Sequence, residues 1–309
     1  MGLRSWALAV VLVPSVVSGA ERIAFIRDGN LWLMDADGTD QEQIGHSGKC
    51  GHPYWSPDGK CLVFESAGNI WRMGFPKREI KRLATTGDCH QPAWRPNTSE
   101  IWFLRMQPQR PGMPDEVPAS MWRVPAGGGP AAWVFKVEGG WGPRRSAWRL
   151  DGRALLYDVD VPEGPNTSVY FTDGHRRDNP FPSSTRGERP FCELEPSWSP
   201  VNRDLVSMGD NNYMKGSSAL WLYDMTKRTF RAIFRPSAPP PNAGVIAWPT
   251  WSPDGKRLAF EYVQTDQPTG ADGVRVSRIS VWVVGLDGRN AEKLAGEAEQ
   301  PAWSPVLSW

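Results

Sequence analysis

Two short clusters of cysteine and histidine are the residues in this sequence with the clearest capacity for chemistry. Cys50 and His52 form one cluster, and Cys89 and His90 form the other. Thiolate sulfur and imidazole nitrogen are ligands that zinc prefers, so a metal site is one hypothesis. The spacing matches no common zinc motif, however, and in an exported chain paired cysteines usually form a disulfide. We therefore predict a Cys50–Cys89 disulfide and no metal, although the chain's four cysteines allow three connectivities.

Motifs that would indicate catalysis or a cofactor are weak. Residues 45–49 read Gly-His-Ser-Gly-Lys, which fails the last position of the Gly-x-Ser-x-Gly nucleophile elbow. The acidic segment from Asp35 to Asp40 lacks the alternating spacing and the distal glutamate of a calcium loop, so a solvated turn is the better interpretation. We predict no catalytic residues and no cofactor.

The composition describes a globular chain built on many turns. The 309 residues include 35 basic and 34 acidic side chains, a balance that does not suggest a nucleic-acid partner. Apolar residues at 40% argue against disorder, and 31 glycines with 29 prolines argue against a bundle of long helices. Seventeen tryptophans spread along the chain suggest a repeated unit.

The first twenty residues have the pattern of a secretory signal peptide. Arg4 supplies a positive charge, residues 6–17 are almost wholly apolar, and Ser18-Gly19-Ala20 suits a signal peptidase. The apolar run is short for a bilayer span, and an uncleaved anchor is the alternative. We predict a signal peptide at 1–20 and a mature domain at 21–309 that is periplasmic or secreted, with no membrane span after cleavage.

A repeat of about fifty residues organises the rest of the chain. Trp-Ser-Pro-Asp-Gly-Lys occurs at Trp55–Lys60 and again at Trp251–Lys256. Seven and nine residues after each tryptophan the side chains are mostly apolar or aromatic, the alternation of a strand with one buried face. Looser copies of the motif, 39 to 54 residues apart, begin at Trp94, Trp148, Trp198 and Trp303.

A second aromatic series and a second turn complete each unit, so we expect four strands, A to D, in each repeat. A lone four-stranded sheet leaves both faces open, and radial stacking of such sheets gives a β-propeller in which the aromatic rings pack between blades. The second series is Trp32, Trp71, Trp122, Tyr170, Trp221 and Trp282.

The repeat count predicts how the ring closes. Five complete units follow one another from Trp55 onward, and the sixth unit is split between the two ends of the chain. Ile23 and Phe25 match the seventh and ninth positions after a missing tryptophan, and Trp303 supplies that tryptophan. We therefore predict an all-β, six-bladed propeller in which the C-terminal segment donates strand A to the N-terminal blade, which removes an open edge.

The pattern Pro-x-Trp-Ser-Pro-Asp-Gly-Lys-x-Leu-x-Phe at 53–64, with Leu-Trp-Leu-Met-Asp-Ala-Asp-Gly at 31–38, resembles the repeats of the TolB-like propeller family. The likeness covers nearly the whole predicted mature chain. It implies the propeller fold and an exported protein, and TolB itself is a periplasmic partner of a peptidoglycan-associated lipoprotein. TolB carries an α/β domain before its propeller, whereas here the repeats follow the predicted signal peptide directly, so the resemblance does not imply the specific TolB role.

Topology predicts where a site would lie. The A–B and C–D turns should share one face, while the B–C loops and D-to-A connections share the other, which also carries the long segments 106–120, 160–168, 209–218 and 264–277. The residue three positions before each strand A tryptophan should surround the channel on that second face. This ring is polar and unrepeated, which is typical of a specificity surface. We expect it to be solvated; its members are His52, Gln91, Arg145, Glu195, Trp248 and Gln300.

The sequence thus predicts a non-catalytic propeller that binds a protein, a peptide or an envelope component through this loop-rich face. The competing hypothesis is a small-molecule binder, or an enzyme of the lyase or hydrolase type, with a polar site in the channel. Glu195, Arg145 and His52 would be its candidate residues. A closed pocket with perturbed ionisable groups would favour the enzyme.

Overall fold

A computed structural model of the chain describes residues 21–107, 118–137, 143–161, 164–178, 180–181, 188, 190, 194–210, 218–236, 244–265 and 277–305. The predicted signal peptide at 1–20 lies outside these residues, as does Cys192. Among the described residues there is no helix with the length and apolar character that a membrane crossing requires.

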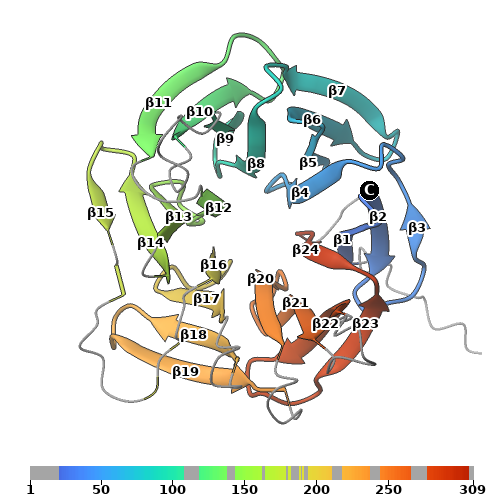
Figure 1. Cartoon of the computed structure of the whole chain (residues 1–309), viewed down its shortest axis with the longest axis vertical. Helices are drawn as coiled ribbons and strands as arrows, with labels where there is room; N and C mark the ends of the chain where they lie inside the picture. The colour runs from blue at the N-terminus through green and yellow to red at the C-terminus, as the bar shows by residue number, and fades with distance from the viewer. Residues whose placement is uncertain are drawn as a thin grey trace, which may run out of the picture.

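The molecule is a closed ring of six four-stranded antiparallel sheets around a central axis, which confirms the predicted fold (Figure 1). In each blade the strand nearest the axis is strand A, and the chain then runs outward. Blade I is β24 (Glu299–Trp303), β1 (Arg22–Arg27), β2 (Asn30–Asp35) and β3 (Glu42–Gln43); blade II is β4 (Cys50–Trp55), β5 (Cys61–Ser66), β6 (Asn69–Gly74) and β7 (Glu79–Ala84); blade III is β8 (Cys89–Trp94), β9 (Glu100–Met106), β10 (Ala119–Pro125) and β11 (Ala132–Val137).

The other three blades follow the same order from the axis. Blade IV is β12 (Pro143–Trp148), β13 (Ala154–Val161), β14 (Gly164–Phe171) and β15 (Arg176–Asp178); blade V is β16 (Leu194–Trp198), β17 (Leu205–Gly209), β18 (Leu220–Asp224) and β19 (Thr229–Phe234); blade VI is β20 (Val245–Trp251), β21 (Arg257–Thr265), β22 (Ser277–Gly285) and β23 (Glu292–Gly296).

Blade I is assembled from segments far apart in the sequence. β24 pairs antiparallel with β1, with Trp303 opposite Ile23 and Ala302 opposite Ala24. Ser304 accepts a hydrogen bond from the Arg22 backbone N–H at 3.0 Å. The split blade therefore has the arrangement that the repeat count predicts.

The strand A tryptophans join neighbouring blades. All six are 4–8% exposed. The indole N–H of Trp55 donates to the Ala302 carbonyl of the preceding blade at 3.1 Å, and that of Trp251 donates to Ser197 in the same way at 3.0 Å. All six rings contribute apolar burial, and those of Trp55 and Trp251 add a hydrogen bond across the seam.

The repeated Ser-Pro-Asp-Gly-Lys segment builds the A–B turn. The Asp58 carboxylate accepts hydrogen bonds from the Ser56 hydroxyl at 2.6 Å and the Lys60 backbone N–H at 3.1 Å. Gly59 has a φ of 68°, a conformation that glycine adopts without a steric penalty. The Phe75 N–H of the C–D turn donates to the Lys60 carbonyl, so the two kinds of turn share one face, here called the lower face.

The opposite, upper face carries the B–C turns and the D-to-A connections. Cys50 N–H donates to the Gly29 carbonyl and Cys89 N–H to that of Gly68, which ties these two elements together. A Cβ on Gly68 would lie 2.2 Å from the Gly87 oxygen, so a side chain is excluded there. The predicted loop at 160–168 is largely strand, because β13 and β14 pair as far as Val161 and Gly164. The other three long segments lie mostly outside the described residues.

Burial of the second aromatic series is uneven, and this predicts different costs of truncation. Trp221 is 2% exposed and its indole N–H donates to Asp210 at 3.2 Å, whereas Trp71 is only half-buried. We expect Trp221→Ala to lower the free energy of unfolding by about 3–5 kcal/mol, and Trp71→Ala by about half as much. Urea unfolding of the two variants checks this; equal losses would contradict the burial argument.

Candidate functional site

The predicted ring residues lie on a bulge that recurs in strand A. In every blade the pairing between strands A and B shifts register at the ring position. Five ring residues precede proline and have left-handed backbone angles, with φ from 47° to 52°. Arg145, which precedes Ser146, does not. A bulge leaves its backbone N–H outside the ladder, so each of these groups needs another acceptor.

Side-chain oxygens supply that acceptor at all six positions. The acceptors come from the neighbouring blade in five cases and from the same blade for Arg145, so these hydrogen bonds cross five of the six seams between blades. The donor N–H groups and their acceptors are His52 with Gln300 Oε1 (2.7 Å), Gln91 with Glu65 Oε2 (3.4 Å), Arg145 with Asp158 Oδ1 (2.7 Å), Glu195 with Asp158 Oδ2 (3.1 Å), Trp248 with Glu195 Oε2 (2.9 Å) and Gln300 with Glu261 Oε2 (2.9 Å).

Three of these acceptors, Glu65, Asp158 and Glu261, were missed by the sequence analysis. Each stands ten residues after its strand A tryptophan, in blades II, IV and VI, where the equivalent residues of the other blades are isoleucine, leucine and methionine. A carboxylate at a repeat position that is otherwise apolar is a readable signal. It indicates a buried charge with a specific partner.

The expectation that the ring is solvated is wrong for its charged members. Arg145 is 9% exposed and Glu195 is 4% exposed. The Arg145 guanidinium donates to the Pro249 carbonyl at 2.8 Å and lies 5.3 Å from the centre of the Trp248 ring. These side chains are buried because the bulge turns them into the channel, where hydrogen bonds and the Trp248 ring take the place of water. Charge reversal at either position should therefore unfold the protein instead of only altering binding.

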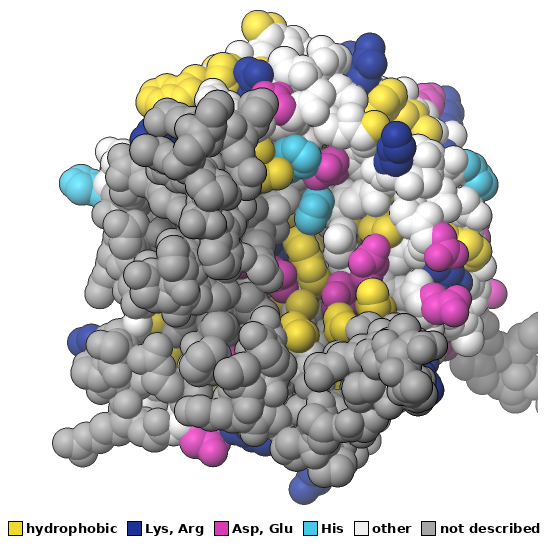
Figure 2. Space-filling view, viewed as in Figure 1, with side chains coloured by type: hydrophobic (Ala, Val, Ile, Leu, Met, Phe, Trp, Pro, Cys, Tyr) yellow, Lys and Arg dark blue, Asp and Glu magenta, His cyan; other side chains and the backbone are white. Residues whose placement is uncertain are grey.

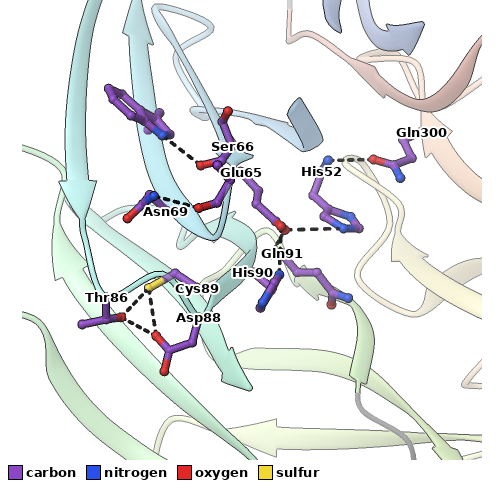
Figure 3. A network of polar contacts seen from close by, with 12 residues as sticks. His52, Glu65, Ser66, Asn69, Thr86, Asp88, Cys89, His90, Gln91 and Gln300 are labelled. Carbon is purple, nitrogen blue, oxygen red and sulfur yellow. Dashed lines mark hydrogen bonds and ion pairs between the residues drawn. The ribbon is translucent and has the colours of Figure 1, made fainter. Parts of the chain in front are cut away.

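The accessible part of the mouth contains a carboxylate between two imidazoles (Figure 3). Glu65 Oε1 lies 2.8 Å from His90 Nδ1, and Glu65 Oε2 lies 3.6 Å from His52 Nε2. The three side chains are 15–24% exposed. Burial lowers the pKa of His52 to about 4, against the opposing effect of Glu65. Burial raises the pKa of Glu65, but hydrogen bonding and the charges of both histidines outweigh it and hold that pKa below its ordinary value.

In the space-filling view, histidine and acidic side chains border a hollow over the axis, with hydrophobic side chains within it (Figure 2). We call the surface formed by His52, Glu65, His90, Trp248 and Gln300 the upper mouth. His52 also packs on Trp248, with ring centres 5.0 Å apart. The upper mouth thus offers imidazole, carboxylate, indole and amide groups to a ligand.

Glu261, which accepts the hydrogen bond from the Gln300 backbone N–H, should make the stability of the protein depend on pH. Burial raises its pKa from 4.5 to about 7; the Gln300 N–H opposes this and Glu299 adds to it. Between these two values the folded chain holds a proton that the unfolded chain releases, so the free energy of unfolding falls as pH rises. Glu261→Gln removes this term.

We expect the stability of Glu261→Gln relative to the unmodified protein to increase by on the order of 3 kcal/mol from pH 4.5 to pH 8. Urea unfolding of both proteins over that range measures the difference. Because the pKa of His52 is lowered, this residue makes the free energy of unfolding rise with pH in part of the range. Both proteins contain His52, so its contribution cancels in the difference between them. Parallel pH profiles would contradict the assignment.

The predicted Cys50–Cys89 disulfide is not present. Cys50, Cys61 and Cys89 all carry free thiols. Cys50 Sγ lies 3.1 Å from the Ser47 hydroxyl, and Cys89 Sγ lies 3.1 Å from that of Thr86. The first thiol belongs to the hydrophobic cluster between blades I and II and the second to the one between blades II and III, so each side chain is committed to a different seam.

The alternative zinc hypothesis has no support, because Cys50 and Cys89 occupy separate clusters while His52 and His90 face Glu65. Within the described residues, no group of three or more histidine, cysteine or acidic side chains has the arrangement of a metal site.

Two side chains cross the channel below the upper mouth. Tyr54 of blade II hydrogen-bonds to the Trp148 backbone of blade IV, and Arg145 of blade IV reaches Pro249 of blade VI. Burial raises the pKa of Tyr54, with Arg145 opposing this. Both side chains line a small cavity of about 20 Å³ on the upper side and a larger one of about 240 Å³ on the lower side. Tyr54 and Arg145 are therefore shared by the linings of the two cavities.

No family model and no curated protein match this sequence. Among solved structures, TolB from Acinetobacter baumannii matches with a TM-score of 0.70 at 15% identity, over 93% of this chain and 67% of that chain. A candidate TolB from Agrobacterium tumefaciens matches with a TM-score of 0.61 at 16% identity, over 90% and 89%. An oligogalacturonate lyase from Vibrio parahaemolyticus matches with a TM-score of 0.53 at 12% identity, over 86% and 71%.

Likeness at such identities concerns the fold. The blade number, the four antiparallel strands per blade and the similarity to TolB structures agree with the resemblance seen in the repeats. The chain is a six-bladed β-propeller whose fold is similar to that of the TolB structures.

Proposed function

We propose that this propeller is exported to the periplasm or secreted, and that it binds a protein, a peptide or an envelope component through the upper mouth without catalysing a reaction. One observation carries the proposal. The backbone donors at all six bulges are satisfied, five of the bulges share one backbone conformation, and the accessible side chains at the upper mouth differ from blade to blade. Rigid scaffolds with divergent side chains are typical of binding surfaces.

The test compares variants of the mature chain, residues 21–309, as bait in envelope extract. His90→Ala and Trp248→Ala change the upper mouth, and Lys256→Ala, whose side chain is 80% exposed on the lower face, is the control. We expect the upper-mouth variants to lose a specific partner that the control retains. A captured protein then needs titration against the purified variants. Loss of binding in Lys256→Ala alone would contradict the proposal.

The enzyme hypothesis keeps one observation in its favour. The upper part of the channel holds ionisable groups with perturbed pKa values, His52 at about 4 and Glu261 at about 7. The structural likeness to an oligogalacturonate lyase supplies a substrate class to try. Turnover of oligogalacturonate that Glu261→Gln abolishes would favour the enzyme; its absence, together with partner capture, would favour the binding protein.

A further inference from the structure

A groove of about 290 Å³ lies between blades III and IV, where their outer strands meet (Figure 1). Strands β9, β10 and β11 of blade III and β14 of blade IV line it, together with the lower-face turns that follow β8 and β14. Its aromatic members are Trp102, Trp133 and Tyr170, and its polar members are Arg95, Arg123 and Thr172. We call the surface formed by these six residues the side groove.

Three residues of the side groove depart from the repeat. Trp133 is the strand D residue that pairs with the second aromatic series, and the other five blades have a polar or small residue there. Those residues are Gln43, Arg82, Arg176, Ala232 and Lys293. Trp102 stands where the other blades have valine, leucine or alanine, and Arg95 stands where four of them have serine. Because the other blades form without these three side chains, the fold does not require them, and a role in binding accounts for them better.

The side groove combines buried aromatic rings with one accessible indole. Trp102 is 3% exposed and is held by Trp148, edge-on at 4.8 Å between ring centres, and by Tyr170 at 5.8 Å. Trp133 is 58% exposed, and its indole forms no hydrogen bond or ring contact with the described residues. A ligand can therefore stack on Trp133 without displacing a partner from that ring.

The charges beside Trp133 favour an anion. Arg95 and Arg123 both donate to Glu100, Arg95 at 3.1 Å and Arg123 at 2.5 Å, so two guanidinium charges face one carboxylate. No acidic side chain is among the described residues that line the side groove. Within the described chain Arg123 donates only to Glu100, and its side chain is 46% exposed. Most of its five N–H donors are therefore available to a ligand, and a guanidinium binds a carboxylate with two parallel hydrogen bonds.

The open border of the side groove distinguishes between kinds of anion. A ligand that stacks on Trp133 keeps its outer face in water, because that indole is at the surface. An aromatic ring would leave an apolar face exposed there, so it would gain only part of its burial energy. A pyranose ring contacts an indole through C–H groups and directs its hydroxyl groups into water. Hydroxyl groups both donate and accept, so they also suit the Thr172 hydroxyl and the Arg95 guanidinium.

We propose that the side groove binds an acidic saccharide, a pyranose ring that carries a carboxylate, either alone or as a unit of a longer chain. The ring stacks on Trp133 and the carboxylate accepts from Arg123. The volume suits about one to two sugar units. The side groove shares no residue with the upper mouth, so the proposal does not depend on the function proposed there.

Ligand-observed NMR titration of the mature chain, residues 21–309, with methyl glucuronide tests the proposal. Methyl glucoside has the same ring with a hydroxymethyl group in place of the carboxylate, and benzoate is a flat carboxylate without hydroxyl groups. We expect the glucuronide to bind at least about tenfold more tightly than either compound, since one charge-assisted hydrogen bond contributes that much. No glucuronide binding, equal affinity for the glucoside, or equal affinity for benzoate overturns the proposal.

Replacing the accessible indole locates the binding. Trp133→Ala removes the stacking surface, and Ile80→Ala, 56% exposed on the outer strand β7 of blade II, is the matched control. We expect at least about a tenfold loss of glucuronide affinity in Trp133→Ala and none in Ile80→Ala. Both side chains are at the surface, so both variants should melt close to the unmodified protein. A folded Trp133→Ala variant with unchanged affinity would place the ligand elsewhere and overturn the assignment.

A second pair of variants tests the role of the charge. Arg123→Gln removes the proposed carboxylate donor, while Arg95 still donates to Glu100. The control is Arg78→Gln, because the Arg78 side chain is 42% exposed and pairs with Glu42 in the same manner. We expect Arg123→Gln to reduce the preference for glucuronide over glucoside to about threefold or less, and the control to keep the full preference. An unchanged preference in Arg123→Gln overturns the assignment of the carboxylate to this arginine.

Discussion

A chain that ends at Ala298 should be insoluble or should unfold at least roughly 10 °C below the full-length protein. It lacks β24, and with it the ladder to β1, the Trp303 indole and the Ala302 carbonyl that Trp55 uses. Loss of the Trp303 packing alone costs about 3–5 kcal/mol, and each kcal/mol shifts the melting temperature of a protein this size by about 2–4 °C. The exposed edge of β1 adds a site for aggregation.

The matched control is a chain that ends at Pro305, which keeps the whole of β24. Differential scanning fluorimetry of both truncations separates the contribution of β24 to the melting temperature from that of the residues that follow it. We expect the control to melt close to the full-length protein. If the Ala298 truncation melts there too, ring closure by β24 does not stabilise the fold, and the split blade is not a structural necessity.

Asp158→Ala should lower the free energy of unfolding by about 3–5 kcal/mol. The carboxylate is fully buried, accepts from the backbone N–H groups of Arg145 and Glu195, and balances the charge of the Arg145 guanidinium. Its removal leaves two bulge donors without acceptors and a buried cation without one of its counter-charges, and breaking a buried pair in this way is strongly destabilising.

Asp158→Asn keeps one acceptor oxygen and should fall between the alanine variant and the unmodified protein. Asp151→Ala is the control, since Asp151 lies on a lower-face turn with its side chain 34% exposed. We expect it to cost about 1 kcal/mol, the usual contribution of such hydrogen bonds. Chemical unfolding measures all three. Similar losses of unfolding free energy for Asp151→Ala and Asp158→Ala would show that the hydrogen bonds between Asp158 and the two bulges stabilise the fold no more than those of a surface turn.

The parts of the fold that the sequence predicts are those repeated in every unit. Apolar residues alternate along the strand that follows Trp55, and tryptophans recur at similar spacings as far as Trp303. Both patterns depend on local backbone geometry, and each unit shows them again. Blade number, strand order and ring closure therefore follow from periodicity and turn chemistry. The A–B and C–D turns lie on one face, and the B–C turns and D-to-A connections lie on the other, as predicted, because antiparallel strands alternate in direction.

The sequence predicts where the ring residues lie along each strand A, but it does not predict how deeply they are buried. Five of the six residues that stand three positions before a strand A tryptophan line the small upper cavity of the channel. Whether Arg145 is solvated depends on what crosses the channel from other blades, here Pro249 and Trp248, about a hundred residues away. The disulfide prediction fails for a related reason. Cys50 and Cys89 occupy equivalent positions in adjacent blades, but the Cys50 side chain packs between blades I and II and the Cys89 side chain packs between blades II and III.

Tyr54 and Arg145 each line both the upper and the lower cavity of the channel. A substitution at either residue therefore changes the walls of both cavities at once, so one side chain alters the propeller from its two faces together.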